Sequence, residues 1–188
     1  MSDMLSKAKS IQDYIIGFRR ELHENPELSG QEFETQKRII RELDKLGIPY
    51  KKAGNTSLIA TLKGAKPGKT VALRGDTDAL PVIEQSGVDY CSQNQGVFHA
   101  CGHDAHTSML LGAAKILSEM KGELAGEVRF FFQEGEETFT GAKKIIEAGG
   151  MKGVDAVFGM HGMSTIETGT YDLNPGYRMA GCDTIFIK

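Results

Sequence analysis

The sequence predicts an α/β protein built around a mixed sheet. Three observations lead to this prediction: two amphipathic helical repeats open the chain, short apolar runs bounded by turn residues follow, and helical and extended patterns alternate in the second half. With 188 residues, 40% of them hydrophobic and 25% charged, the chain has the length and composition of one globular domain.

Helices are expected at the beginning of the chain. Apolar side chains recur at helical spacing over residues 5–22 and stop before Asn25-Pro26, a pair that ends helices. The same spacing runs over residues 33–46 and stops at Gly47. We therefore expect two amphipathic helices before the first strand.

Three apolar runs then predict strands. Residues 57–64 (SLIATLKG) and 69–76 (KTVALRGD) are separated by Pro67-Gly68, a turn signal, which favours two strands joined as a hairpin. Residues 127–133 (EVRFFFQ) contain three consecutive phenylalanines, and we expect them to form a fully buried strand.

Helix and strand alternate through the rest of the chain. Asp104 is placed to cap a long helix, and residues 140–150 (TGAKKIIEAGG) favour a helix that ends at paired glycines. Strands are expected at 154–161 and 168–174, and residues 182–188 also have strand character.

The composition excludes several classes of function. The formal net charge is −3 and the basic residues are scattered, so no basic stripe is available to bind nucleic acid. The first 22 residues lack a continuous apolar region, which argues against a signal peptide or membrane anchor and favours a cytoplasmic protein. Three widely spaced cysteines fit a reducing compartment. We therefore expect a small-molecule partner, no nucleic acid and no membrane.

The segment HACGHDAHT, residues 99–107, holds three of the five histidines and one of the three cysteines. A metal site, a redox thiol and a polar turn all use these residue types, so the segment alone leaves three interpretations open. In open α/β sheets, ligands gather at the carboxyl ends of strands. Polar residues follow three of the predicted strands at that position: Asp76 and Asp78, residues 134–137, and His161.

Together these loops supply thiolate, imidazole and carboxylate groups, which are metal ligands. Cys101 and His103 are two residues apart, and in an extended segment this spacing lets both side chains reach one ion. Taken singly, each residue is more simply interpreted as buried or structural. With Glu137 and His161 at strand ends, a metal site becomes the better interpretation. A cysteine nucleophile paired with histidine stays open for Cys101, but it leaves the carboxylates unexplained.

Glu136 and Glu137 are adjacent, so in an extended loop they would point to opposite sides and take separate roles. One would bind metal, while the other would take a proton from an attacking water and deliver it to a leaving amine. The alternative is a solvated pair of glutamates on a loop.

Other polar residues near these loops have less specific interpretations. Asp76 and Asp78 either orient a ligand imidazole through its second nitrogen or form a turn. His99 and His106 are doubtful as ligands. His23 ends a predicted helix, where a histidine interacts favourably with the helix dipole, and we expect it to be structural.

Five motifs, taken in order, resemble those of metal-dependent amidohydrolases of metallopeptidase family twenty, a group that includes hippurate hydrolase, aminoacylase and the auxin-conjugate hydrolases. The motifs are LHENPELSGQE, RGDTDALP, HACGHDAHT, QEGEE with GAKKIIEAGGM, and VDAVFGMH. The match runs from about residue 14 to 188. It implies a three-layer α/β/α fold with a mixed, mainly parallel sheet, similar to the catalytic domain of zinc exopeptidases.

The resemblance also implies a chemistry. It implies hydrolysis of the amide between an acyl group and an amino acid or similar amine, with two divalent ions, manganese or zinc, cobalt or nickel being alternatives. Asp76 stands where other branches of the family have a metal-binding histidine, and Cys101 is expected to compensate for it. The implied metal ligands are Cys101, His103, Glu137 and His161, and the implied general acid/base is Glu136.

Relatives of this kind are longer than this chain. The resemblance implies that residues 1–180 form the N-terminal part of a catalytic domain and that residues 181–188 form a strand leading into a lid and dimerisation domain. In complete relatives that domain forms a homodimer, and a later segment adds a metal-binding histidine. We therefore expect a metal-dependent amidohydrolase or, alternatively, a truncated, catalytically silent fragment that binds metal.

Overall fold

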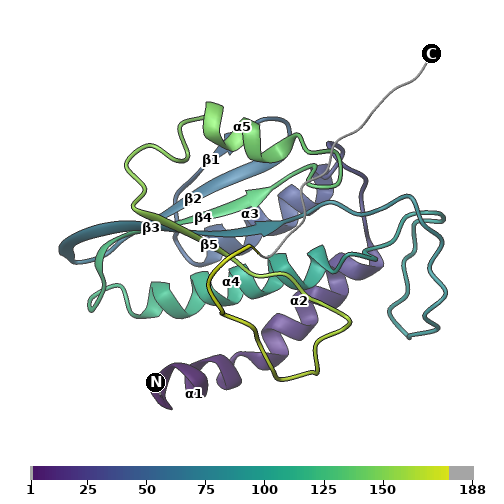
Figure 1. Ribbon diagram of the computed structural model, residues 1–188, viewed down its shortest axis with the longest axis horizontal. Helices are drawn as coiled ribbons and strands as arrows, with labels where there is room; N and C mark the ends of the chain where they lie inside the picture. Colours follow the sequence, from purple (N-terminus) through teal and green to yellow (C-terminus); the bar gives the residue numbers. More distant parts are fainter. Residues whose placement is uncertain (1, 178–188) are drawn as a thin grey trace.

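A computed structural model describes residues 2–177. Its centre is a five-stranded sheet with the strand order β1-β2-β4-β3-β5 (Figure 1). β2 pairs antiparallel with β1 and with β4, whereas β3 pairs parallel with β4 and with β5, so the predicted mixed sheet is confirmed. The strands are β1 (Tyr50–Ala53), β2 (Ser57–Lys63), β3 (Lys66–Asp76), β4 (Ala125–Gln133) and β5 (Ala156–Gly159).

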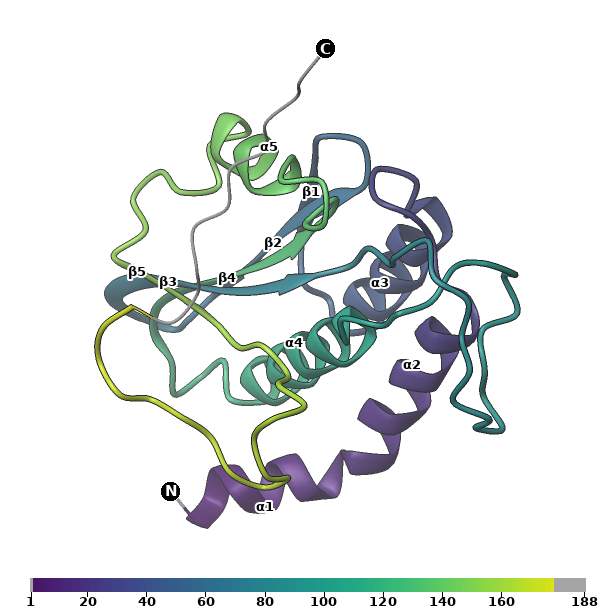
Figure 2. The ribbon, with the colours of Figure 1, turned by 45° about the vertical axis from the view of Figure 1, so that its right-hand side comes forward.

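Helices cover both faces of the sheet and make the fold a three-layer α/β/α arrangement (Figures 1 and 2). One layer contains α2, α3 and α4, with α1 at its edge, and the opposite layer contains α5. The helices are α1 (Ser2–Ser10), α2 (Gln12–Glu24), α3 (Phe33–Lys45), α4 (His103–Glu119) and α5 (Gly141–Glu147). Within residues 2–177, no helix combines the length and apolarity needed to cross a bilayer.

β4 contributes to both apolar cores. Phe130 and Phe132 point into the larger core beneath α2, α3 and α4, while Phe131 points into the smaller core beneath α5. Successive strand residues face opposite sides, so this run of aromatic residues binds both helical layers to the sheet. The strand is fully buried only over residues 130–133; its first half is partly exposed, which corrects the expectation of burial throughout.

The predicted hairpin between the strands now labelled β2 and β3 is wrong. β4 lies between them, antiparallel to β2 and parallel to β3. The connection bends over the start of β4, where the N–H of Gly64 donates to the carbonyl of Gly126. Pro67 and Gly68 fall inside β3 at a register shift, so these turn residues mark an irregularity in a strand.

The helix predictions need one change. The first predicted helix is two helices, because Ile11 adopts a turn conformation between α1 and α2. The helices predicted around α3 and α5 are confirmed. β1 was not predicted, because its four residues, YKKA, carry little apolar pattern.

The last part of the chain departs from the predicted pattern. The strand predicted at 154–161 is confirmed in shorter form as β5. The strand predicted at 168–174 is wrong, because these residues form an exposed loop that pairs with no strand of the described chain. The strand predicted at 182–188 and the expected domain boundary after residue 180 lie outside the described residues.

Candidate metal centre

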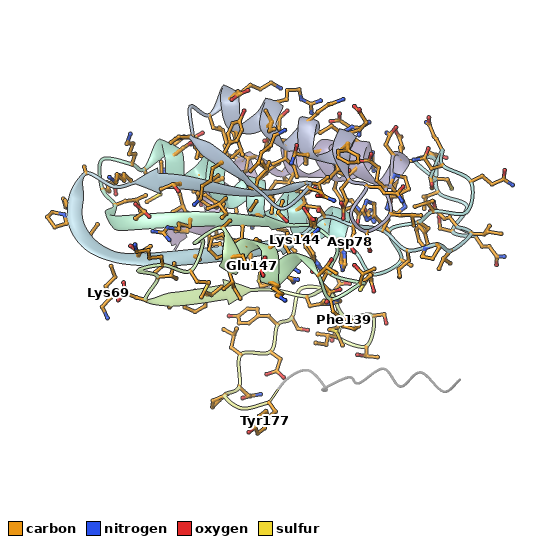
Figure 3. The ribbon with its side chains drawn as sticks, turned by 90° about the horizontal axis from the view of Figure 1, so that it is seen from above. Lys69, Asp78, Phe139, Lys144, Glu147 and Tyr177 are labelled. Atoms are coloured by element: carbon orange, nitrogen blue, oxygen red, sulfur yellow. The ribbon has the colours of Figure 1, made fainter. Side chains whose placement is uncertain are left out.

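Four loops meet at the carboxyl ends of the parallel strands, the edge at which open α/β sheets bind ligands. Asp76 ends β3 and Asp78 follows it, residues 134–137 follow β4, His161 follows β5, and the fourth loop leads into α4. Figure 3 shows Asp78 at this end of the sheet and Lys69, near the start of β3, at the opposite end. The predicted site residues therefore come together at one end of the molecule.

Gly102 determines how its two neighbours are presented. It adopts a φ of 84°, in the left-handed region that favours glycine, and serves as the N-cap of α4. The turn places the side chains of Cys101 and His103 in one group of possible metal ligands. The His103 side chain is fully buried, while Cys101 is half-buried and free of any disulfide.

The four predicted ligands fall into two groups that share His103: Cys101, His103 and His161 form one group, and His103, Glu136 and Glu137 form the other. The Sγ of Cys101 lies 3.3 Å from Nε2 of His161, and Nε2 of His103 lies 3.8 Å from Oε1 of Glu137. The ligand atoms of Cys101, His103 and His161 all lie within 4.8 Å of one another. Zinc-ligand bonds of about 2.0–2.3 Å put the atoms around one ion roughly 3–4 Å apart. The spacing therefore suits a bound cation after small side-chain movements.

Two buried ligand atoms without a hydrogen-bond partner in the described part of the chain indicate that a cation fits here. Nε2 of His103 and Oε1 of Glu137 are buried without a hydrogen-bond partner among the described residues. Such orphaned atoms are costly unless a ligand meets them. Burial, together with the neighbouring Glu137 and Glu136 carboxylates, raises the pKa of the Cys101 thiol to about 12. A divalent cation would reverse that effect, and thiolate, imidazole and carboxylate are donors that it accepts.

Asp78 connects two of these candidate ligands. Nδ1 of His103 lies 2.9 Å from the Asp78 carbonyl oxygen and 3.2 Å from its Oδ1. Oδ2 accepts the N–H of Glu137 at 3.0 Å and the hydroxyl of Ser29 at 2.7 Å. Burial opposes ionisation of Asp78, but these hydrogen bonds outweigh it and lower its pKa. Asp78 therefore turns Nε2 of His103 toward the shared space.

Asp76 contacts a different histidine. Its Oδ1 lies 2.7 Å from Nδ1 of His106, and its Oδ2 accepts from Arg74 at 2.6 Å. Burial disfavours the carboxylate, but the His106 bond and the charges of His103 and Arg74 outweigh it and lower the pKa of Asp76 to about 2. The other His106 nitrogen, Nε2, accepts the N–H of Gly162 at 2.8 Å.

Glu136 lies beside the candidate ligands. Its Oε2 is 3.8 Å from Nε2 of His103, and its side chain is 34% exposed. Burial and the charges of Asp76 and Glu137 raise its pKa, as suits a group that accepts and returns a proton. The expectation that the two glutamates point to opposite sides is wrong. The chain turns at Gly135, where φ is 54°, and both carboxylates approach His103.

Two buried carboxylates fasten the loop after β4. Glu134 accepts the backbone N–H groups of residues 55–57 and the ammonium of Lys144. Glu32, which precedes α3, accepts the N–H of Gly135 at 2.9 Å. These bonds hold the first two residues of the turn that leads to the two site glutamates.

A second buried network supports the start of α4. The expected cap role of Asp104 is wrong: Gly102 caps the helix, and Oδ2 of Asp104 lies 2.6 Å from Nδ1 of His23 and accepts from Arg19 at 2.8 Å. His23 is buried in this network, in agreement with its structural interpretation. His99 is buried, and neither of its ring nitrogens has a partner in the described part of the chain.

Sequence reasoning missed several residues that support the site. The sequence assigned no buried supporting role to Glu32, Glu134 or Asp104, and only the tertiary structure shows their burial. The spacing of His106 could have indicated its place in the site, because His106 lies three residues after His103 on one helix and residues at this spacing share a face.

Comparisons with known proteins add the following findings. The sequence model of the peptidase family M20/M25/M40 matches residues 72–183. Thermostable carboxypeptidase 2 of Saccharolobus solfataricus is 48% identical over 183 residues, which are 95% of this chain and 47% of that protein. N-acyl-L-amino acid amidohydrolase of Geobacillus stearothermophilus is 45% identical over 176 residues, which are 93% of this chain and 48% of that protein.

A solved structure matches as well. A Bacillus subtilis protein, described as a dinuclear metal binding peptidase from the M20 family, shares 45% identity with a TM-score of 0.81. The alignment covers 84% of this chain and 44% of that one. The chain thus spans about half the length of the curated relatives it matches.

Proposed function

The chain belongs to the peptidase family M20/M25/M40, and from this premise we propose that it forms the metal site of a hydrolase acting on the amide bond of N-acyl amino acids or related conjugates. The observation that carries the proposal is that the four candidate ligands form two groups that share His103 and lie beside Glu136. The name of the Geobacillus relative, N-acyl-L-amino acid amidohydrolase, supports this substrate class.

The proposed ligands are contributed by three loops and the start of α4. Two unpaired buried atoms and the donor chemistry support them, and the dinuclear Bacillus structure supports two ions per complete site. We propose manganese or zinc, with cobalt or nickel as alternatives. A bound divalent ion would supply Lewis-acid polarisation of the scissile carbonyl and of the attacking water. The proposed ligands are Cys101, His103, Glu137 and His161.

Glu136 is the proposed general acid/base. Its carboxylate would accept a proton from water as the water oxygen bonds to the acyl carbon. It would return that proton to the amine nitrogen as the C–N bond breaks, which releases a carboxylic acid and a free amine. Asp78 would hold the His103 ring through these steps, because it occupies the ring nitrogen that faces away from the site.

The remaining parts of the proposal concern context. We propose a small-molecule substrate, supported by the name of the Geobacillus relative, and no nucleic-acid partner, supported by the net charge of −3. We also propose a cytoplasmic location without a membrane partner. We propose residues 1–180 as the N-terminal part of the catalytic domain and 181–188 as a strand leading into a lid domain. In the complete protein, that domain would form a homodimer.

A second candidate is a chain that binds metal without turnover. Two observations favour it: the chain spans about half the length of its relatives, and His161 is exposed, which leaves the site open to water. Metal content and product release, measured on the same sample, separate the two candidates.

The experiment compares two cysteine variants. The chain is stripped with a chelator and given Zn²⁺ or Mn²⁺; bound metal is measured by mass spectrometry, and amine release from an N-acetyl or N-benzoyl amino acid is followed. Cys101→Ser should lower metal affinity by about tenfold or more. Cys91→Ser is the matched control, because the Cys91 thiol donates to the carbonyl of Val88 at 2.8 Å outside the site.

Each result has a defined meaning. Metal uptake lost only in Cys101→Ser, with metal-dependent amine release at any rate above the metal-free background, supports the hydrolase. Uptake without amine release supports the silent alternative. No uptake by the unaltered chain, or equal uptake by both variants, contradicts the metal site.

A further inference from the structure

His106 is enclosed within the site without belonging to the proposed ligands. It lies one turn into α4, is 3% exposed, and its ring centroid is 4.7 Å from that of His161 and 5.5 Å from that of His103. An imidazole in this position would either bind metal itself or orient a residue that binds metal.

The hydrogen bonds of His106 decide between these roles. Nε2 accepts the backbone N–H of Gly162, so the ring hydrogen sits on Nδ1 and is donated to Asp76. Both nitrogens are therefore occupied. Asp76, His103 and His106 do form a compact group of possible ligands, but His106 has no lone pair left for an ion.

The bonds continue from His106 to His161. His106 accepts the N–H of Gly162, which belongs to the peptide that joins His161 to Gly162, and the carbonyl of Gly162, in the next peptide, accepts from Nδ1 of His161 at 2.7 Å. This bond directs the opposite nitrogen, Nε2, toward Cys101. His161 is itself exposed, and its orientation depends on the bond from Nδ1 to Gly162 and on the edge contact with the His106 ring.

We propose that His106 is a positioning residue: held by Asp76, which Arg74 also contacts, it fixes the peptide between His161 and Gly162 and thereby aims the His161 ring at the metal site. The effect on metal binding rests on the proposed function, but the hydrogen bond from the Gly162 N–H to His106 exists without metal. Outer partners of this kind typically change metal affinity by about 10–100-fold when removed.

Two substitutions separate the two hydrogen bonds of the ring. In His106→Gln, the side-chain oxygen reaches the place of Nε2 and still accepts from Gly162, while the bond to Asp76 is lost. In His106→Asn, the shorter amide still donates to Asp76, but nothing reaches Gly162. His99→Asn is the matched control, because it removes another buried imidazole that has no hydrogen-bond partner among residues 2–177.

The first measurement needs no metal. Amide hydrogen exchange is followed at Gly162 and at Gly135, whose N–H is bonded to Glu32 instead. In His106→Asn, exchange at Gly162 should accelerate on the order of tenfold while Gly135 stays unchanged. His106→Gln and His99→Asn should leave both amides near their original rates. A merely destabilising substitution would accelerate both amides together.

The second measurement is Zn²⁺ affinity, determined by competition with a chromophoric chelator. His106→Asn should bind Zn²⁺ about 10–100-fold more weakly, whereas His106→Gln and His99→Asn stay within a few-fold of the unaltered chain. Equal weakening by both His106 variants, no weakening by either, or loss of a whole equivalent of bound Zn²⁺ would overturn the positioning role. If the unaltered chain binds no Zn²⁺, the proposed function fails, and the exchange rates still decide whether His106 holds Gly162.

Discussion

At the scale of single residues, the division of work between Glu136 and Glu137 is the sharpest consequence of the site. Glu136→Gln should keep the metal and lower kcat on the order of a hundredfold or more, because an amide cannot carry the proton. Glu137→Gln should instead lower metal content. The measurement pairs metal analysis with kcat on active enzyme that contains this sequence; metal loss in Glu136→Gln, or near-normal turnover, would show that the two roles are assigned wrongly.

The sequence predicts which residues meet, but not how they are held. Cys101, His103, Glu137 and His161 follow predicted strands or precede a predicted helix, and the carboxyl ends of parallel strands share one edge. The orientation of Glu137 depends on a turn at a glycine, which the extended-loop argument did not foresee.

At the scale of elements, the contact between α5 and β4 should make stability depend on pH. Burial disfavours ionised Glu134, but Lys144 and three backbone N–H groups outweigh it and lower its pKa from 4.5 to about 2. A lowered carboxyl pKa stabilises the folded state above the unfolded pKa, and that stability is lost as the pH falls through the folded pKa. About 3 kcal/mol should therefore disappear between pH 4.5 and pH 2.

Urea unfolding of Glu134→Gln at pH 7 and at pH 3 tests this dependence. The variant should be less stable than the unaltered chain at pH 7, and the difference should shrink by about 2 kcal/mol at pH 3. Glu147→Gln is the control, because the Glu147 side chain, at the end of α5, is 62% exposed. A pH-independent difference for Glu134→Gln would show that its charge contributes nothing to folding.

A lysine pair on α5 gives a second test at this scale. Lys144 bonds to buried Glu134, whereas the Lys143 side chain is 80% exposed; Figure 3 shows Lys144 on the side of α5 that faces the site end of the sheet. Lys144→Met should destabilise the fold by roughly 3 kcal/mol or more, because it leaves a buried carboxylate without its cation. Lys143→Met should change the unfolding free energy by less than about 0.5 kcal/mol; equal effects of the two variants would contradict this account.

Elements with strong local patterns were predictable, and their pairing was not. α3, α4, α5 and β4 follow from apolar periodicity within one segment. The insertion of β4 between β2 and β3 depends on contacts between segments far apart in sequence, and a turn signal at Pro67-Gly68 carries no information about them. The isolated strand pattern at 168–174 failed for the same reason.

At the scale of the whole molecule, the openness of the site predicts slow chemistry in this chain by itself. His161 and the loop that follows it are exposed, and Figure 3 shows that loop, as far as Tyr177, standing away from the sheet. A wet site weakens the electrostatic stabilisation that an enclosed site provides. The 188-residue chain should therefore bind metal yet hydrolyse an N-acyl amino acid far more slowly than about 1 per second, a rate at the low end for enzymes. A faster measured rate would show that the site closes without further protein.

The central claim is that one space between four side chains binds a divalent cation. The most direct measurement is a crystal structure of the chain grown with Zn²⁺, with anomalous data collected on both sides of the zinc absorption edge. The account predicts a zinc peak about 2.3 Å from the Sγ of Cys101 and about 2.0–2.1 Å from the Nε2 atoms of His103 and His161, with a Glu137 oxygen completing the shell. A site without a peak, or zinc bound elsewhere while these four side chains keep their positions, would contradict it.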